Sequence, residues 1–579
     1  MIRQTGESGR ATNVDGYPSE HLRVTIRAGT CECSGHGAEV LEAGRGCTVI
    51  ADTGRVSAAT ARAAVEAIRR GRHVQSILPA SAGSVLVHDA DTGGVELIAG
   101  GTWGSAVAYR DAGDTLYVST SLPWLRRQGT RDPADVLWLA QAMLGSDPPE
   151  GTPYSGIGHL PLGHRLRWRP GWPLRVDRWY SPPLEDPRST AEEWVERYRE
   201  RLRGVLAEVI GPGTADVHVL MSAGLDSTTV AAFAAELIGL RRRVRAMVHT
   251  PLPPAAADGP SDEGWVRDDL PAAQTMARRW PNIHVEPLRN DALETPFDVL
   301  PSYYRDEELP VLAPTNMVWV LAGRRRAATA QVGAVLTGQS GNRCYSYRLP
   351  RLTGPLLRAA SPGAAIDALR ARARATGAPL WRVLASDVAG PKLSDRRRPR
   401  SRTPLPDAGL AYLAPHVRAE LAELEQPSLL HAPWGPGTSM RENVLSLPLL
   451  AGRPTRLVDV LSAPQLLGLV ASLPATAFVG VGSGRSFARR VMHGYVPDAI
   501  RLRHQLGSQS ADAQSVLRDR GGLLVEIDAL LADPGVREVL DVERMRRDLQ
   551  HPTTDRAPMD AWLGRALALG LFVQGQPRS

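Results

Sequence analysis

The chain has 579 residues and a formal net charge of +7, with 43% hydrophobic and 22% charged residues. This length can bury two or three full cores, and this balance is that of an ordinary soluble enzyme. No apolar run reaches the ~18 residues that a membrane-spanning helix needs, and the first residues hold no apolar signal core. The composition therefore excludes a membrane partner and predicts a cytoplasmic protein.

Cysteine and lysine are scarce, which limits the chemistry that the chain can perform. The four cysteines, Cys31, Cys33, Cys47 and Cys344, are too few and too scattered for a disulfide framework. Almost all of the positive charge is arginine, and Lys392 is the single lysine. A basic balance suits an acidic partner. Because no zinc-finger or aromatic RNA-binding motif accompanies it, we expect no nucleic acid partner.

The first part of the chain has the pattern of a sheet-rich domain. Residues 1–20 are polar and Gly-rich, which predicts a flexible N-terminus. Alternating apolar residues between turns follow, up to about residue 120, and predict antiparallel sheet. The clearest such segments are 84–87, 95–98, 105–109 and 115–118.

A helix and a linker are expected to end this first domain. The helix covers 132–144, with Asp132 at its start and Gly145 at its end. The Pro-rich segment 181–187 predicts the linker. The first domain should therefore cover residues 21–186.

After the linker the pattern becomes that of a parallel α/β domain over residues 187–579. The expected elements are a charged amphipathic helix over 190–210, a buried strand over 216–221, a helix over 228–240 and a strand over 244–249. This order begins a parallel sheet. The Arg-, Pro- and Ala-rich stretch 345–440 should be mostly helical where it is ordered, and so should the tail that follows it.

The loop between the buried strand and its helix is the main candidate site. It reads Ser222-Ala223-Gly224-Leu225-Asp226-Ser227-Thr228. Gly224 tolerates the backbone angles of a tight turn, and the backbone N–H groups at a helix N-terminus form an anion cradle. Ser222, Ser227 and Thr228 add hydroxyl donors. The loop therefore predicts a phosphate-binding site.

Asp226 and the missing lysine narrow this prediction. A carboxylate would repel phosphate unless a cation lay between them, so Asp226 is expected to hold Mg²⁺. The loop has no terminal Gly-Lys-Ser/Thr to grip a γ-phosphate, which favours the binding of pyrophosphate over phosphoryl transfer.

The loop resembles the Ser-Gly-Gly-x-Asp-Ser pyrophosphate loop of the N-type ATP pyrophosphatases, with Ala223 in place of the first glycine. The wider chain resembles the asparagine synthetase family. Further motifs that carry the resemblance are IGHLPLGH at 157–164, DRWY at 177–180, VLTGQSGN at 335–342, GRSFARR at 484–490, GYVPD at 494–498 and RLR at 501–503.

The resemblance implies an α/β protein with two domains. The first would be an α+β sandwich like that of the Ntn hydrolases, and the second a parallel domain of the adenine nucleotide α-hydrolase type. The resemblance also implies that ATP and Mg²⁺ are used to activate a carboxylate as its AMP ester. ATP would lie against the loop residues, including Leu225, with Leu220 and Val248 near the adenine and Gly338 near the sugar and phosphates.

The chain departs from the glutamine-hydrolysing members of this family at its start. Those members use a cysteine directly after the initiator methionine, with its own α-amine as the base. Residue 2 here is Ile2. We therefore expect no glutaminase activity, and an amine supplied by the substrate instead of ammonia.

Two further departures affect the synthetase site. The family places an aspartate metal ligand where this chain has Asn342, whose amide oxygen is a weaker ligand. It places a lysine where this chain has Gln505. Gln505 can donate to an oxyanion, and losing one such donor typically costs ~2.7–4 kcal/mol. The missing positive charge would come from Arg501 or Arg503, which are the expected catalytic residues beside Gln505.

Several nearby residues have open assignments. His504 is either a base for the attacking amine or a polar surface residue. The acids at 262–263 and 268–269 are either exposed charges or part of the site. Tyr303, Tyr304 and Trp319 either line the acceptor pocket or, as we favour, pack in the core.

Family members that lack the cysteine and still form amides include β-lactam synthetases and lasso peptide macrolactam cyclases. The chain most resembles the cyclases, which implies that an Asp or Glu side chain of a precursor peptide is adenylated and attacked by the peptide's N-terminal amine. A leader-binding protein and a leader protease would be further partners. The alternatives are a synthetase for a small metabolite and an inactive nucleotide-binding partner.

Overall fold

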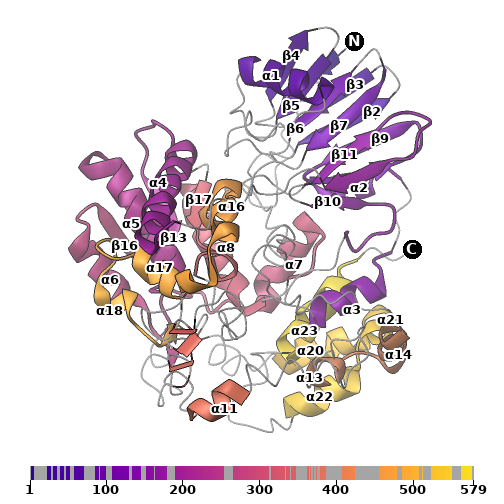
Figure 1. Cartoon of the computed structure of the whole chain (residues 1–579). Helices are drawn as coiled ribbons and strands as arrows, with labels where there is room; N and C mark the ends of the chain where they lie inside the picture. Colours follow the sequence, from indigo (N-terminus) through magenta and orange to yellow (C-terminus); the bar gives the residue numbers. More distant parts are fainter. Residues whose placement is uncertain are drawn as a thin grey trace.

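The computed structural model describes the chain in separate stretches. They are 2–4, 22–27, 30–34, 39–44, 47–51, 58–70, 85–89, 92–98, 107–129, 133–144, 151–161, 164–178, 189–252, 265–311, 314–330, 332, 334–339, 341–346, 362–363, 365–366, 369–370, 373, 379–385, 407–423, 456–478, 485–507, 511–512, 523–550 and 562–576. The expected linker at 181–187, Lys392 and the acids at 262–263 lie outside them. In Figure 1 the N-terminal strands, the parallel sheet and the C-terminal helices form three separate regions.

The N-terminal region is a sandwich of two six-stranded sheets. The first has the order β1 (Ile2–Gln4), β3 (Thr30–Ser34), β2 (Arg23–Arg27), β9 (Thr115–Ser119), β8 (Val107–Asp111) and β10 (Gly158–Leu160). The second has the order β12 (Arg175–Arg178), β11 (His164–Trp168), β7 (Gly94–Ile98), β6 (Val85–Asp89), β5 (Cys47–Ala51) and β4 (Glu39–Gly44). Apart from the parallel pair β1–β3, the pairings are antiparallel.

Alternation along the strands builds the core of this sandwich. Cys31 and Cys33 on β3 point inward and pack with Leu86 and Leu97 of the other sheet. The predicted antiparallel sheet is thus confirmed. The alternating pattern did not locate α1 (Ala58–Arg69), a helix that contacts β4 and β5. Its alanine-rich sequence favours helix over strand.

Two helices lie between β9 and β10 in the chain, α2 (Leu122–Arg126) and α3 (Val136–Leu144). The helix predicted over 132–144 is confirmed over the residues of α3. Asp132 and Gly145 lie outside the described residues. The capping bond comes from Asp135, whose carboxylate accepts a hydrogen bond from the Trp138 N–H at 2.9 Å.

The second region is a five-stranded parallel sheet. Its order is β16 (Ile283–Leu288), β14 (Val244–His249), β13 (Val217–Leu220), β17 (Ala334–Thr337) and β18 (Arg456–Asp459). The helices around it are α4 (Ala191–Ile210), α5 (Leu225–Ile238), α6 (Leu270–Arg279), α8 (Pro314–Thr329), α16 (Pro464–Ser472) and α17 (Ser486–Val491). The predicted α/β class is confirmed by this arrangement.

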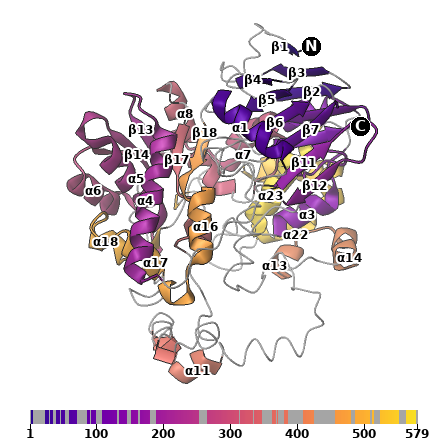
Figure 2. The same cartoon turned by 45° about the horizontal axis from the view of Figure 1, so that its top comes forward.

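The two faces of the sheet carry different helices. Val217 and Val219 face the core that α4 and α5 share with α16 and α17. Leu220 and Met247 face α8, where they contact Ala327. Figures 1 and 2 both show β13 between α5 and α8. Because all five strands are parallel, their C-terminal ends lie at one edge of the sheet.

The third region consists of helices that share one hydrophobic core with α3. They are α7 (Pro296–Glu307), α13 (Asp407–Leu410), α14 (Pro415–Glu423), α20 (Leu523–Ala532), α21 (Pro534–Val539), α22 (Val542–Gln550) and α23 (Trp562–Gln574). The smaller elements are β15 (Trp265–Val266), β19 (Leu506–Gly507), α11 (Leu380–Leu384), α18 (Asp498–Arg501) and the 3₁₀ turns at 239–241, 341–343, 460–462 and 475–478. No helix among the described residues is long and apolar enough to cross a membrane.

Candidate functional site

The candidate loop lies where β13 ends and α5 begins, at the carboxyl edge of the parallel sheet. The loop is closed by its own serines. The Ser222 N–H donates to Ser227 Oγ at 3.0 Å, and the Gly224 N–H donates to Ser222 Oγ at 3.1 Å. The two hydroxyl oxygens are 3.2 Å apart. These bonds hold the loop in one shape without a ligand.

Gly224 is needed for a different reason from the one expected. Its φ of −80° and ψ of 157° are extended angles that other residues also adopt. A Cβ at Gly224 would instead lie 3.0 Å from Ser222 Oγ, within the closed loop. Ala223 likewise has no positive φ, so its replacement of the family's first glycine costs no backbone strain.

The N-terminus of α5 is left open for an anion. Gly224 is its N-cap and offers no side-chain hydrogen bond to the first turn. We expected the Thr228 hydroxyl to donate a hydrogen bond to the bound anion, and the structure differs. Thr228 is fully buried, and its hydroxyl donates to the Gly224 carbonyl at 2.7 Å. The first-turn N–H groups therefore carry the partial positive charge of the helix end toward the edge of the sheet.

Asp226 is a buried carboxylate without enough partners. Burial raises its pKa to about 6, against the lowering effects of Ser346 and of the Arg485 charge. Among the described residues, its Oδ1 atom accepts no hydrogen bond. A native protein rarely leaves such an atom unpaired unless an ion or ligand completes it. This atom fits the expectation that Asp226 binds Mg²⁺.

The second predicted loop packs directly on the first. A Cβ at Gly338 would lie 2.8 Å from the Asp226 backbone carbon, and one at Gly341 would lie 2.2 Å from the Asp226 Oδ1 atom. Only glycine allows this approach. Asn342 is exposed and follows Gly341 in a 3₁₀ turn. The structure thus brings Asn342 to the neighbourhood of Asp226.

Asp459 brings a second carboxylate to this edge, which sequence reasoning missed. It ends β18 and pairs with Thr337 of β17 in the sheet register. Asp226 and Asp459 both raise the pKa of the buried Cys344 thiol, alongside the larger effect of burial. Among the described residues, no cluster of three metal-ligating side chains forms. An ion here would therefore rely on these two carboxylates, Asn342 and the phosphates of ATP.

Arg503 is connected to the loop through Asp269. Arg503 Nη2 donates to Asp269 Oδ1 at 2.8 Å, and the Ala223 N–H donates to Asp269 Oδ2 at 3.2 Å. Asp269 is only 9% exposed, which resolves its open assignment in favour of the site. The short parallel pair β15–β19 holds these two segments together. The charge of Arg503 is thus neutralised by a residue that orients the loop.

Among the described residues, no hydrogen bond or ion pair joins the other two predicted catalytic residues, Arg501 and Gln505, to the loop. Arg501 is buried and donates to Asp498 Oδ1 at 2.7 Å and to the Arg489 carbonyl at 3.3 Å. Gln505 and His504 are exposed. The position of the missing lysine is therefore not refilled by Arg501.

Arg485 supplies positive charge that sequence reasoning did not assign to the site. Burial raises the pKa of Asp226 and of Tyr345, and the charge of Arg485 opposes this rise at both residues. It precedes α17 with a left-handed φ of 58°, a conformation that costs a non-glycine residue about 1 kcal/mol or more. Its place within the GRSFARR motif was the available signal.

The predicted adenine neighbours lie at the same edge, with their side chains in the core. Leu220 packs under α8, where a Cβ at Gly323 would lie 2.6 Å from it, and Val248 is fully buried. Tyr303 and Tyr304 are buried, and Tyr304 stacks edge-on against Phe572. The favoured core assignment of these tyrosines agrees with this packing.

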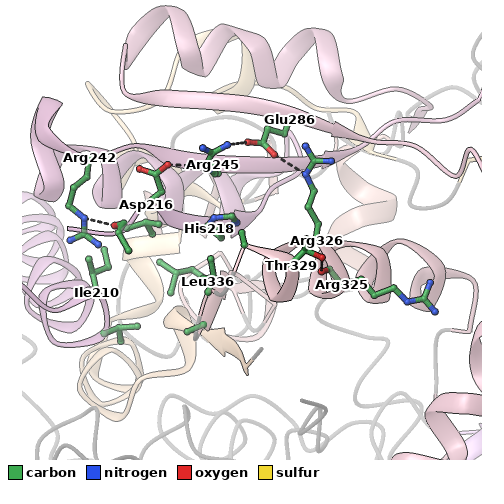
Figure 3. Close-up of a pocket in the computed structure, with 16 residues that line it drawn as sticks. Ile210, Asp216, His218, Arg242, Arg245, Glu286, Arg325, Arg326, Thr329 and Leu336 are labelled. Carbon is green, nitrogen blue, oxygen red and sulfur yellow. Dashed lines mark hydrogen bonds and ion pairs between the residues drawn. The ribbon is translucent and has the colours of Figure 1, made fainter. Parts of the chain in front are cut away.

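A separate cavity of about 960 Å³ lies at the opposite, amino edge of the sheet (Figure 3). A chain of ion pairs crosses it. Arg245 contacts Asp216 at 2.9 Å and Glu286 at 2.7 Å, and Arg326 contacts Glu286 at 3.0 Å. These pairs join β14, β16 and α8, so we assign the cluster to the stability of the sheet.

Comparison with known proteins gives one family. The family model described as asparagine synthase matches residues 202–433, which include both glycine loops. This match confirms the resemblance to the asparagine synthetase family over those residues. No curated protein matches the chain at the threshold of significance.

Two solved structures show weak likeness. The U34-tRNA thiolase NcsA from Methanococcus maripaludis is 14% identical, with a TM-score of 0.19, and the match covers 44% of this chain and 72% of that one. The glutamine phosphoribosylpyrophosphate amidotransferase from B. subtilis is 11% identical, with a TM-score of 0.17, and the match covers 46% and 75%. Such low scores carry no argument about function.

Proposed function

From the premise that residues 202–433 form an asparagine synthase region, we propose that the protein is an ATP-dependent ligase that forms a C–N bond. It activates a carboxylate as its AMP ester and releases pyrophosphate. An amine then attacks the ester carbon, and AMP leaves. The observation that carries this proposal is the buried Asp226 Oδ1 atom, unpaired among the described residues, beside the uncapped N-terminus of α5.

The geometry supports pyrophosphate formation in two ways. The first-turn N–H groups of α5 bind the departing phosphates, because they carry partial positive charge and no side-chain cap. Mg²⁺, held by Asp226 with Asp459 or Asn342 nearby, would neutralise charge on the phosphates of ATP. The close fit of Gly338 and Gly341 against Asp226 keeps both loops at this position.

We propose further that glutamine is not the source of the amine. Cys31 and Cys33 lie inside the sandwich, and burial raises the pKa of Cys31 to about 12 and that of Cys33 to about 11. A thiol with such a pKa is not a nucleophile near neutral pH. Ile2 pairs with Cys31 in the sheet register. The sandwich then serves as a scaffold for the synthetase region.

We propose a precursor peptide as the substrate, with an Asp or Glu side chain as the carboxylate and the N-terminal amine of the same peptide as the nucleophile. The resemblance to lasso peptide cyclases and the net charge of +7 support this choice. A leader-binding protein and a leader protease are the proposed partners, and the cytoplasm the proposed location. The second candidate is a synthetase for a small metabolite, like the β-lactam synthetases. Those enzymes also lack the cysteine at the position where this chain has Ile2.

The experiment compares two panels of acids with ATP and Mg²⁺. One panel holds peptides with a free N-terminal amine and an acidic side chain at ring distance, and the other holds small amino acid-like acids. We expect AMP release and a product that has lost one water from a member of the peptide panel, measured by mass spectrometry. Turnover of small acids alone would contradict the peptide assignment, and turnover of neither would favour an inactive nucleotide-binding protein.

A further inference from the structure

A histidine–aspartate pair lies at the same edge of the sheet as the loop. His249 is the last residue of β14, and its Nε2 atom is 3.4 Å from Asp512 Oδ1. The other oxygen of Asp512 accepts a hydrogen bond from the Leu252 N–H at 3.3 Å. The Asp512 side chain is 3% exposed and that of His249 is 13% exposed. The aspartate thus orients the ring, and the histidine side chain keeps a small exposed surface.

The sheet register places His249 beside the pyrophosphate loop. Leu220 of β13 pairs with Met247 of β14, and the Met221 N–H donates to the Met247 carbonyl at 2.9 Å. Extended two residues past the end of β13, the same register would pair Ser222 with His249. Neighbouring strands are ~4.8 Å apart, and alternate side chains share a face. His249 and Ser222 therefore start from adjacent positions on the face that α8 covers.

A small cavity of about 70 Å³ adjoins the imidazole. Trp319 forms one wall, with its ring centroid 6.2 Å from that of His249. Its charged lining residues are the acids Asp291, Glu294 and Asp512 and the single cation Arg289. Glu294 pairs with Arg325 at 3.0 Å and Asp512 with His249, so these two acids are already compensated. The volume admits the end of an uncharged amine-bearing chain. Trp319, whose assignment was open, is thus partly a wall of this cavity.

The charge state of Asp512 suits an imidazole that accepts a proton. Burial raises its pKa, but the hydrogen bond and charge of His249 and the Leu252 N–H lower it further, so the net pKa lies below its usual range. Asp512 therefore remains a carboxylate near neutral pH. A carboxylate at Nε2 fixes the ring orientation and stabilises the imidazolium, which leaves Nδ1 for the substrate.

We propose that His249, oriented by Asp512, is the general base for the amine that attacks the acyl-adenylate. This inference rests on the proposed function and deepens it. The neutral amine nitrogen forms the C–N bond, and the bond from the acyl carbon to the AMP oxygen breaks, with its electron pair leaving on AMP. The proton that the nitrogen loses passes to His249 Nδ1. This assignment supplies a group for the second half-reaction, in which Arg501 and Gln505 have no visible part.

The test separates the two half-reactions in the full-length protein. ATP–pyrophosphate exchange reports adenylation, and product mass spectrometry reports amide formation. In His249→Gln we expect exchange within about twofold of wild type and amide formation lower by roughly 10²-fold or more, the usual contribution of a general base. Asp512→Asn should reduce amide formation in the same direction. The matched control is His284→Gln, an exposed histidine on the neighbouring strand β16, which should change neither rate.

Hydroxylamine adds a readout that a structural role would not move. It is largely uncharged near neutral pH and attacks acyl-adenylates without a base, so His249→Gln should form hydroxamate at the wild-type rate. Amide formation at the wild-type rate in His249→Gln would overturn the inference. It would also be overturned if exchange and hydroxamate formation fell as much as amide formation. If wild type catalyses no exchange with any acid, the proposed function fails first, whereas loss confined to amide formation supports both.

Discussion

At the scale of single residues, burying the Asp226 carboxylate costs free energy of folding. Its carboxylate is buried, its Oδ1 atom has no hydrogen-bond partner among the described residues, and burial raises its pKa to about 6. A buried charge without partners destabilises a fold. Stability therefore does not explain this residue, whereas the proposed Mg²⁺ would explain it.

Asp226→Asn should change how the stability of the ligand-free protein depends on pH. The folded-state pKa of Asp226 is raised above its unfolded value of ~3.9, so its contribution to stability is largest at low pH. As pH rises through about 6, wild type should lose up to roughly 3 kcal/mol of unfolding free energy that the variant keeps.

The measurement is thermal unfolding of both proteins without ATP and Mg²⁺. Asp226→Asn should match wild type near pH 4 and exceed it near pH 7. Asp114→Asn, a change at an exposed aspartate, should follow wild type throughout. A variant that is less stable than wild type near pH 7 would show that Asp226 has a stabilising partner.

At the scale of elements, the site is made by two loops that close on each other. The loop before α5 and the loop after β17 meet at Gly341, where a Cβ would lie 2.2 Å from Asp226 Oδ1. The Ser222–Ser227 bonds fix the first loop from within, and Asp269 fixes it from outside. A small displacement of either loop should therefore move the Asp226 carboxylate and lower the rate of adenylation.

Gly341→Ala tests this closure. The added methyl group must push the Asp226 carboxylate aside, so ATP–pyrophosphate exchange should fall by on the order of 10²-fold, while the far-UV circular dichroism spectrum stays that of wild type. Gly213→Ala is the control, because a Cβ at Gly213 meets no atom within 4 Å. Exchange that survives Gly341→Ala would show that Asp226 does not need its present position.

The local part of this site could be predicted from sequence, and the long-range part could not. A run of mostly apolar residues, followed by small and hydroxyl residues, predicted the strand, loop and helix around Ser222. The helix starts at Leu225, earlier than expected, because Gly224 is its N-cap. The contact of Ala223 with Asp269 spans 46 residues, and that of His249 with Asp512 joins still more distant segments. Periodicity carries no information on such pairs.

At the scale of the whole molecule, the sandwich and the C-terminal helices are tied by a buried polar cluster. Arg126 of α2 contacts Glu308 at 2.9 Å, lies 4.1 Å from the Tyr154 ring and donates to Gln576 at 3.1 Å. Tyr154 donates to the Glu308 carbonyl at 3.0 Å. Glu308 is the C-cap of α7, a central helix in Figure 1. The N-terminal sandwich thus contacts and supports the C-terminal helices.

Arg126→Ala should destabilise this junction. The Arg126 side chain is 4% exposed, and breaking a buried ion pair from one side typically costs about 3–5 kcal/mol. We expect a lower unfolding temperature by calorimetry and earlier proteolysis between the two halves. The neighbouring Arg127 is exposed, so Arg127→Ala should leave both unchanged. Equal stability of the two variants would contradict a supporting role for the sandwich.

The most direct test of carboxylate activation is acid-dependent exchange of labelled pyrophosphate into ATP, with ³¹P NMR of the products. The account predicts exchange with wild type and Mg²⁺, products of AMP and pyrophosphate, and no exchange in Asp226→Ala. Products of ADP and phosphate, or exchange that survives Asp226→Ala, would contradict it.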